Sequence, residues 1–254
     1  MINGLYLSAQ GAHTQQIRLD VVSNNLANAS STGFKRDMTV FESHLPFDFV
    51  QGNPRDTPEK LANSWGGTTI AEIKTDYSQN PLQATEGSLD VALAGPGFLK
   101  VATKAGKFLT RDGALTLQQD GTLETSGGAK VLSDEGAPIT VNPSEGEIFI
   151  GAEGIVSQEA EGDFTEVGRI ALVEPQSYDK LKKVGDNLYT NLGGDRPVGP
   201  ETSLKQGFLE ASGVKPVNEM VNLIETSRAF EANLNMIKFQ DEALGNLLST
   251  VPRL

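Results

Sequence analysis

The sequence predicts an α+β protein with a helix at each end and an all-β region between them. An apolar stripe with spacings of mostly three and four residues runs near the N-terminus through Ile2, Leu5, Ala9, Ala12, Leu19, Val22 and Leu26. A similar stripe near the C-terminus runs through Met220, Leu223, Phe230, Leu234, Ile237, Leu244 and Leu248. The middle of the chain has short alternating runs, many glycines and Asp-Gly pairs, which are typical of strands and hairpins.

Both terminal stripes are narrow, as in the seam of a coiled coil rather than the broad face of a helix on a globular core. Gln16 interrupts the first stripe, and Ser227 and Asp241 are the polar members of the second. We therefore expect the ends to form a coiled-coil-like stalk that assembles with other subunits. The alternative is that the two helices pack only on each other within one chain. Apolar residues beside the first stripe, such as Leu7 and Ile17, favour several neighbours.

Four segments are expected along the 254 residues. They are an N-terminal assembly helix at 1–33, a linker and extended region at 34–80, a central β-domain at 81–205, and a turn with the C-terminal assembly helix at 206–254. The first helix should end near Asn28, with Gly33 suited to a positive φ. Pro216 should lie in the first turn of the last helix, where a missing N–H is harmless.

The central region should contain many short strands. They are expected at 69–73, 88–93, 98–101, 107–111, 114–117, 130–132, 139–141, 147–150, 154–157, 169–173 and 187–190. Asp112-Gly113 and Asp120-Gly121 are expected to be hairpin turns of a meander. A helical turn is expected at 178–184, before the last strand.

Composition excludes several classes of protein. The net charge of -12 argues against binding nucleic acid or an anionic membrane surface. The chain has no cysteine, so disulfides and thiolate metal sites are excluded. No apolar run is long enough for membrane insertion, and the first eleven residues lack the pattern of a cleavable signal.

Three motifs resemble the rod and hook proteins of the bacterial flagellum. Near the N-terminus, Leu19–Asn28 is followed by Thr32-Gly33-Phe34-Lys35-Arg36. Near the C-terminus, Gln206–Val214 resembles the family's Gln-Gly-x-Leu-Glu-x-Ser-Asn-Val, with Gly213 in place of Asn. In the middle, Leu89–Leu93 and Thr110–Gly113 resemble the family's β-domain. Because Gly and Asn both tolerate left-handed backbone, we expect the turn at Gly213 to persist.

The resemblance implies a structural subunit of the rod, the drive shaft of the flagellum. In such proteins the terminal helices pack as a tube around the export channel, and the β-domain lies outside. The implied partners are other copies and other rod and hook proteins, with the flagellar export apparatus during secretion. The implied location is the periplasm-spanning rod of the basal body, reached without a cleaved signal peptide. The segment 75–82 is most similar to proximal rod members, and distal rod members are the close alternative.

The candidate functional residues are therefore subunit contacts, not catalytic groups. The expected contacts are Leu5, Leu19, Val22, Asn24, Asn25, Leu26, Asn28, Phe34, Met220, Leu223, Phe230, Leu234, Ile237, Leu244 and Leu248. The three asparagines exceed what one helix cap needs, which favours hydrogen bonds between subunits.

No catalytic, cofactor-binding or metal-binding residue is expected. His13 and His44 have no metal-ligand spacing. A β-domain enzyme or glycan-binding protein is the alternative from another class, with Asp76, Asp90 and Asp112 as conceivable carboxylates. Asp112 is better explained by its turn and Asp90 by the polar face of a strand.

Overall fold

The computed structural model describes residues 2–43, 67–160 and 162–250, and it has the expected α+β composition. The chain divides into two compact units. The helical unit contains Met1–Ala27, Arg36–Asp76 and Val214–Leu254, and the β-unit contains Asn28–Lys35 and Tyr77–Gly213. The segment 28–35, expected to end the helix region and begin a linker, is thus part of the β-unit. Residues 44–66 of the expected linker and extended region at 34–80 lie outside the described residues.

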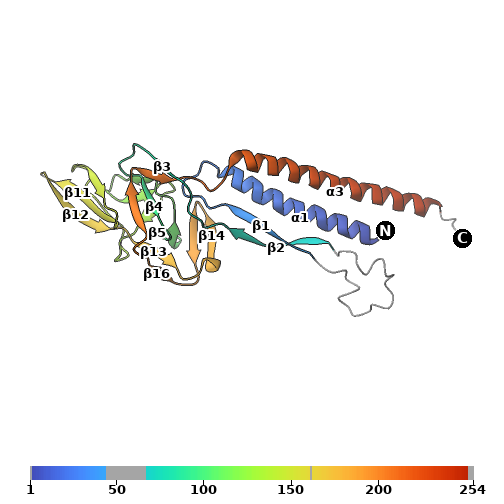
Figure 1. Cartoon of the computed structure of the whole chain (residues 1–254), viewed down its shortest axis with the longest axis horizontal. Helices are drawn as coiled ribbons and strands as arrows, with labels where there is room; N and C mark the ends of the chain where they lie inside the picture. Colours follow the sequence, from blue (N-terminus) through green and yellow to red (C-terminus); the bar gives the residue numbers. More distant parts are fainter. Residues whose placement is uncertain (1, 44–66, 161, 251–254) are drawn as a thin grey trace. The chain divides into compact units, whose positions relative to one another are not determined.

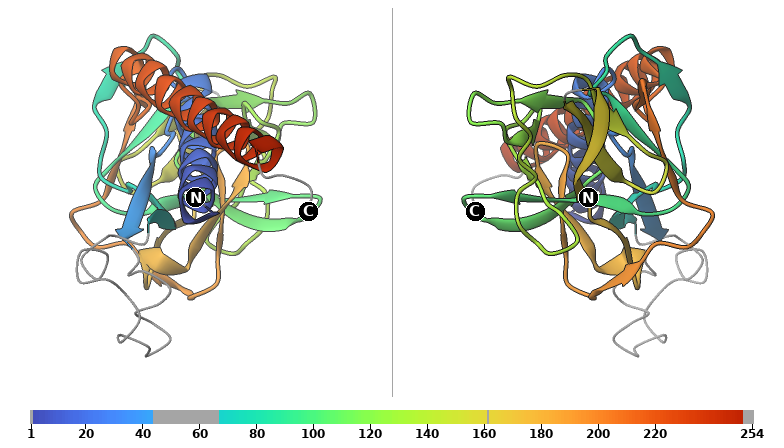
Figure 2. Two further views of the ribbon diagram at one scale, coloured as in Figure 1. Left: turned by 90° about the vertical axis from the view of Figure 1, so that its right-hand side faces the viewer. Right: turned by 90° about the vertical axis from the view of Figure 1, so that its left-hand side faces the viewer.

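The helical unit pairs the two terminal helices. Helix α1 (Ile2–Ala27) and helix α3 (Pro216–Thr250) lie side by side (Figures 1 and 2). Strands β1 (Asp37–Ser43) and β2 (Thr68–Thr75) form an antiparallel pair that packs against α1. Pro216 is the first residue of α3, as its missing N–H predicts. Among the described residues, no helix is both long and apolar enough to cross a membrane.

The β-unit is built from sixteen short strands. In chain order they are β3 (Leu82–Ala84), β4 (Val91–Ala94), β5 (Phe98–Thr103), β6 (Gly106–Thr110), β7 (Leu115–Leu117), β8 (Leu123–Thr125), β9 (Lys130–Val131), β10 (Ile148–Ile150), β11 (Ile155–Ala160), β12 (Asp163–Arg169), β13 (Leu172–Pro175), β14 (Leu181–Gly185), β15 (Leu188–Asn191), β16 (Asp195–Pro197), β17 (Ser203–Gln206) and β18 (Phe208–Glu210).

Antiparallel pairing organises these strands around two cores. Nine of them form one sheet, with the path β14-β15-β6-β5-β9-β8-β7 and β13 and β16 attached through β5. Strands β10, β11 and β12 form a separate sheet, and β17–β4 and β18–β3 are pairs. The larger core is aliphatic, and a smaller one packs Phe98 and Tyr189 against Tyr77 and Tyr178.

Local turn chemistry predicts one of the two expected hairpins. Asp120-Gly121 joins β7 to β8, and Gly121 has a φ of 81°. Asp112-Gly113 does not form a hairpin, because β6 pairs with β5 and β15 whereas β7 pairs with β8. Its residues make long-range contacts instead, described below.

Other local expectations are also corrected. Only residues 178–180 form a helical turn, after which the chain continues as β14. Strand β15 is not the last, since β16, β17 and β18 follow it. The expected strand at 139–141 forms only an isolated bridge, between Thr140 and Thr122.

The glycines of the two terminal motifs have different roles. Gly33 has a φ of 66°, as expected, and a Cβ there would lie 2.3 Å from the carbonyl oxygen of Arg111. The expectation of left-handed backbone at Gly213 is wrong, because Gly213 is not among the residues with positive φ. Its N–H donates to the carbonyl oxygen of Phe34 at 2.9 Å, and a Cβ would lie 2.9 Å from Asn80 Oδ1. Close packing, rather than a turn conformation, explains the small residue.

We expect Gly113→Ala to destabilise the β-unit by at least about 3 kcal/mol, because overpacking against rigid backbone cannot be relieved by a side-chain rotation. The added Cβ would lie 1.6 Å from the carbonyl oxygen of Val91. Gly127→Ala is the matched control, since its nearest contact would be an ordinary 3.8 Å to Thr125 Oγ1. Thermal unfolding of the full chain by circular dichroism compares them. Equal melting temperatures would refute the close contact at Gly113.

Candidate functional site

A buried ionic cluster links four distant parts of the β-unit. The Glu210 carboxylate lies 2.6 Å from Lys35 Nζ and 3.2 Å from Arg111 Nη1, and all three side chains are almost completely buried. Glu210 also accepts a hydrogen bond from the backbone N–H of Asn80 at 2.9 Å. Lys35 donates to the carbonyl oxygen of Ser78 at 2.7 Å. Burying charge is unfavourable unless each group is paired, and here each has several partners.

The Thr110–Gly113 motif contributes Arg111 to this cluster. Arg111 donates to the carbonyl oxygen of Gly95 at 2.9 Å and lies over the ring of Phe98. Asp112 is buried and accepts hydrogen bonds from the hydroxyls of Thr32 and Ser126. Asp112 therefore joins the segment 28–35 to the sheet, which corrects the expectation that it serves only a local turn.

Phe34 is held inside the same arrangement. It is 5% exposed, and Lys183 Nζ lies 4.2 Å from the centre of its ring. Lys183 also donates to the carbonyl oxygen of Lys35 at 2.5 Å. Ser212 donates to the carbonyl oxygen of Asn28 at 2.8 Å, which joins the two terminal motifs directly. The part of the N-terminal motif from Asn28 to Lys35 thus belongs to the β-unit and is bonded to other segments of that unit.

In the helical unit, α3 has a row of partly or fully buried residues that alternates between polar and apolar. Glu219, Thr226, Asn233 and Gln240 recur every seven residues, and so do Leu223, Phe230, Ile237 and Leu244. Together the two sets have the spacing of a coiled-coil seam. Glu219 Oε2, Thr226 Oγ1 and Gln240 Oε1 are buried and have no hydrogen-bond partner within the described residues. Each such atom opposes burial, so this row contributes less than an apolar seam would.

Two glycines of α1 make room for the amides of α3. A Cβ at Gly11 would lie 2.9 Å from Asn233 Oδ1, and a Cβ at Gly4 would lie 3.1 Å from Gln240 Nε2. Both glycines and both amides are seven residues apart, and the pairing order makes the helices antiparallel. A shift of either helix would place these amides against larger side chains. The glycine–amide pairs therefore specify the register of α1 against α3.

Fourteen of the fifteen expected contact residues fall into three groups by exposure. Val22, Asn25 and Phe34 are buried within the chain. Met220 and Leu234 are exposed, at 50% and 38%. Asn24 is also exposed, and Leu5, Leu19, Leu26, Asn28, Leu223, Phe230, Ile237 and Leu244 are partly buried. The side chain of Leu248 lies outside the described residues.

Asn25 already uses its amide within one chain. Its Nδ2 donates to the carbonyl oxygen of Asp37 at 2.8 Å, and its Oδ1 accepts from the backbone N–H of the same residue at 3.0 Å. These two hydrogen bonds attach the start of β1 to the end of α1. Asn28 likewise accepts from Ser31 at 3.1 Å through Oδ1. Both asparagines thus have roles in folding the monomer.

Sequence reasoning overlooked the ionic cluster. Lys35, Arg111 and Glu210 each lie inside one of the three motifs quoted above, but their charges were not considered together. The available signal was that Lys35 follows Phe34 and that Glu210 lies between Leu209 and Ala211, because a charge among apolar neighbours requires a partner of opposite charge if it is buried.

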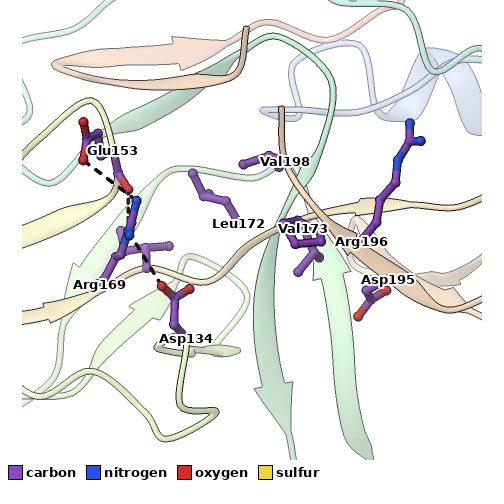
Figure 3. A pocket seen from close by; sticks show the side chains of 10 residues that line it. Asp134, Glu153, Arg169, Leu172, Val173, Asp195, Arg196 and Val198 are labelled. Atoms are coloured by element: carbon purple, nitrogen blue, oxygen red, sulfur yellow. Dashed lines mark hydrogen bonds and ion pairs between the residues drawn. The ribbon is translucent and has the colours of Figure 1, made fainter. Parts of the chain in front are cut away.

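A hollow in the β-unit shows no group set apart for catalysis among its described lining residues. Arg169 lies between Asp134 and Glu153, at 3.7 and 3.9 Å, on one side (Figure 3). On the other side, Arg196 pairs with Glu174 at 2.7 Å. Apolar side chains, among them Leu172, Val173 and Val198, lie between these two charged groups (Figure 3).

Asp195, in the same lining, pairs with Lys100 at 2.9 Å. Burial alone would raise the pKa of Asp195, but hydrogen bonds from Lys100 and Asn191 hold it below its ordinary value. Each charged side chain that lines the hollow thus has an ion-pair partner.

Comparison with known proteins identifies relatives over nearly the whole chain. Three family models match: flagella basal body rod protein at residues 5–35, flagellar hook protein FlgE/F/G D1 domain at 92–158, and flagellar basal body rod FlgEFG protein C-terminal at 205–250. A flagellar basal-body rod protein FlgF of Caulobacter vibrioides is 39% identical, with 93% of each chain covered.

Proteins named FlgG are similar to this chain as well. A flagellar basal-body rod protein FlgG of Buchnera aphidicola is 35% identical over 97% of this chain and 99% of its own length. The FlgG protein of Bacillus subtilis is 33% identical over 98% and 99%.

We expect Lys35→Met to destabilise the full chain by about 3–5 kcal/mol, because it leaves the buried Glu210 carboxylate with one fewer cation. Lys74→Met is the control. Lys74 pairs with Glu72 at 2.9 Å, but both side chains are more than half exposed, so a loss within about 0.5 kcal/mol is expected. Urea unfolding followed by fluorescence measures both. Similar losses for the two variants would show that the cluster is no more important than a surface pair.

Gly11→Ala tests the register of the helices. Alanine is normally favoured over glycine in a helix by about 1 kcal/mol, but here we expect the contact with Asn233 to remove that gain. Gly245→Ala should be neutral or stabilising, since its Cβ would meet nothing within 4 Å. The double variant Gly11→Ala/Asn233→Ala should recover most of the loss. Thermal unfolding is measured for all three variants. A higher melting temperature for the Gly11→Ala single variant than for the unaltered protein would contradict the pairing.

Proposed function

We propose how this chain works from the premise that it belongs to the family of flagellar basal-body rod proteins. It is a structural subunit of the flagellar rod and not an enzyme. In this proposal α1 and α3 form a coiled-coil-like stalk that assembles helically with the same helices of other subunits. Assembled stalks line the export channel, and the β-units transmit torque around them.

The observation that carries the proposal is the apolar surface of α3. Its exposed members are Val217, Met220, Val221, Ile224, Leu234, Met236, Phe239 and Leu247. Tyr6 and Leu7 of α1 are exposed as well, at 68% and 40%. Exposed apolar side chains in this number on two paired helices are typical of a surface that another protein covers. Because these apolar side chains stay exposed when α3 packs on α1, they remain available for neighbouring subunits.

Within this proposal the contact residues have two kinds of role. Exposed Met220 and Leu234 contact neighbouring subunits directly. Buried Val22, Asn25 and Phe34 support assembly by holding the monomer in the competent fold. The partly buried members complete their burial when further helices pack alongside.

Torque transmission requires stiffness in each subunit. The ionic cluster supports this role, because paired buried charges have strict geometry and resist sliding of the segments they join. Lys35 and Glu210 belong to the motifs that precede and follow the β-unit's main segment in sequence. A load entering through either motif would thus be carried by bonds inside the β-unit.

The finer identity that we propose is the proximal rod type, with the distal type as the alternative. The proposal rests on the segment 75–82, which resembles proximal rod members. We further propose that the chain resides in the periplasm-spanning rod and is exported through the flagellar channel without a cleaved signal. Its partners would be other copies, other rod and hook proteins, and the export apparatus in transit. Neither nucleic acid nor membrane insertion is part of this function.

Leu234→Asp separates assembly from folding. Leu234 is 38% exposed in the monomer, so we expect melting to change little, whereas rods should be lost because an unpaired charge would be buried between subunits. Asp241→Asn on the same helix should leave both rods and swimming nearly intact. Electron micrographs of basal bodies and a soft-agar motility assay read the outcome. Normal rods from the Leu234→Asp chain would exclude this surface as an assembly contact.

Complementation decides the rod type. The chain is expressed in two strains of its source bacterium, one lacking its proximal and one lacking its distal rod protein. We expect swimming to be restored only in the first. Restoration only in the second would assign the distal type while leaving the assembly proposal unaffected. Failure in both, with the chain detected by antibody in the cell, would overturn the proposed role.

A further inference from the structure

The sheet β10-β11-β12 has one face that nothing in the described structure covers. Its other face contributes Ile150 and Val156 to the core and is buried. On the open face, Phe149 is 56% exposed and Phe164 is 64% exposed. Figure 1 shows β11 and β12 at one extremity of the β-unit. Two large aromatic side chains on an outlying sheet are unusual for a surface that stays in water.

The strand register places acidic side chains between the two phenylalanines. Phe149 lies opposite Ser157, which lies opposite Glu166. In the neighbouring row Phe164 lies opposite Glu159, and Glu159 donates its backbone N–H to the carbonyl oxygen of Glu147. Paired residues of antiparallel strands share a face. Both rows therefore combine one aromatic ring with one or two carboxylates.

Acidic side chains outnumber basic ones in this region, where Arg169 at the end of β12 pairs with Asp134 and Glu153. Between Lys130 and Arg169 the sequence contains no lysine or arginine, but it contains Asp134, Glu135, Glu145, Glu147, Glu153, Glu159, Glu161, Asp163 and Glu166. The backbone of Glu159 bonds the Gly146–Glu147 segment, which brings two carboxylates onto paired backbone, and like charges across paired strands destabilise a sheet. Among the described residues, neither makes an ion pair. A cation from outside would relieve this repulsion.

A metal ion does not fit this face. Within the described residues, no group of three acidic or histidine side chains is close enough to hold one. The carboxylates are instead spread over three strands beside aromatic rings. Arginine and lysine suit that pattern, because their charged heads pair with carboxylates and their stems or guanidinium planes pack on aromatic faces.

We propose that the open face of β10-β11-β12 is a docking surface for a basic protein partner, one that presents arginine or lysine beside an apolar side chain. Phe149 and Phe164 receive the apolar groups and cation stems, and Glu147, Glu159 and Glu166 receive the charges. This surface belongs to the β-unit alone and is distinct from the helical surface described above. Its partner can therefore be a protein other than a second copy of this chain.

The test measures binding of a defined probe to the full chain. The probe is a fluorescein-labelled peptide of alternating arginine and leucine, and matched peptides replace arginine by glutamate or leucine by serine. Fluorescence anisotropy is recorded at low and at moderately high salt. The arginine–leucine peptide should bind more tightly than both matched peptides, with affinity falling about tenfold as salt screens the charges.

Paired variants locate the binding site. Glu147→Gln/Glu159→Gln should weaken binding about tenfold, and Phe164→Ser should weaken it by a similar factor. Controls on the same unit are Glu201→Gln and Val184→Ser, both at exposed positions, and neither should change affinity. The Glu147→Gln/Glu159→Gln chain should also melt no lower than the unaltered protein, since a repulsion is removed.

Unchanged affinity in both the glutamate and the phenylalanine variants would overturn the proposal, as would equal binding of the three peptides. Loss of binding in the control variants to the same extent would show that the interaction follows net charge rather than this face, and would also overturn it.

Discussion

The carboxylate of Glu210 is the point on which the β-unit's organisation depends. It is held by Lys35 and Arg111 and by the backbone N–H of Asn80. These partners come from segments that are far apart in sequence, and a buried carboxylate tolerates the loss of none of them without a large penalty. Such a group is weak evidence for high stability but strong evidence for one arrangement. The segments it joins must be placed correctly before the charge can be buried.

The cluster also explains how one chain builds two units. The chain passes between them after Ala27, Lys35, Asp76 and Gly213. Each of these passages lies within a few residues of the bonds described here: Lys35 and Glu210 pair with each other, Ser78 accepts from Lys35, and Ser212 donates to Asn28. The β-unit therefore holds the chain at every place where it leaves for the helices.

The helices follow a different principle. Along α3 the residues packed toward α1 are half polar, whereas Met220, Ile224, Phe239 and others remain exposed. Glycine–amide pairs specify register at the cost of buried atoms that lack partners. A helix pair of this kind favours correct alignment over stability. It leaves apolar surface for the additional helices that we propose to pack there in the assembled rod.

The sequence by itself determined the terminal helices, the β-rich middle and the family. Helical periodicity and Pro216 place α1 and α3 within a residue or two, because these signals act over a single turn of helix. Asp120-Gly121 predicts its hairpin for the same reason, since the short loop between Leu117 and Leu123 is a local structure. The three motifs identify the family because they are short and occur in order.

Only the tertiary structure decided what the motif residues do. Lys35 and Glu210 are 175 positions apart, and no periodicity relates them. The pair Asp112-Gly113 is typical of a hairpin turn. In the structure, however, Asp112 accepts a hydrogen bond from the hydroxyl of Thr32, and Gly113 lies close to the carbonyl oxygen of Val91. A glycine at position 213 suggests left-handed backbone, but its φ is not positive. A Cβ there would instead lie close to the side chain of Asn80. Local rules describe what a segment can adopt alone, whereas burial of a charge or a close backbone contact depends on segments that meet only after folding.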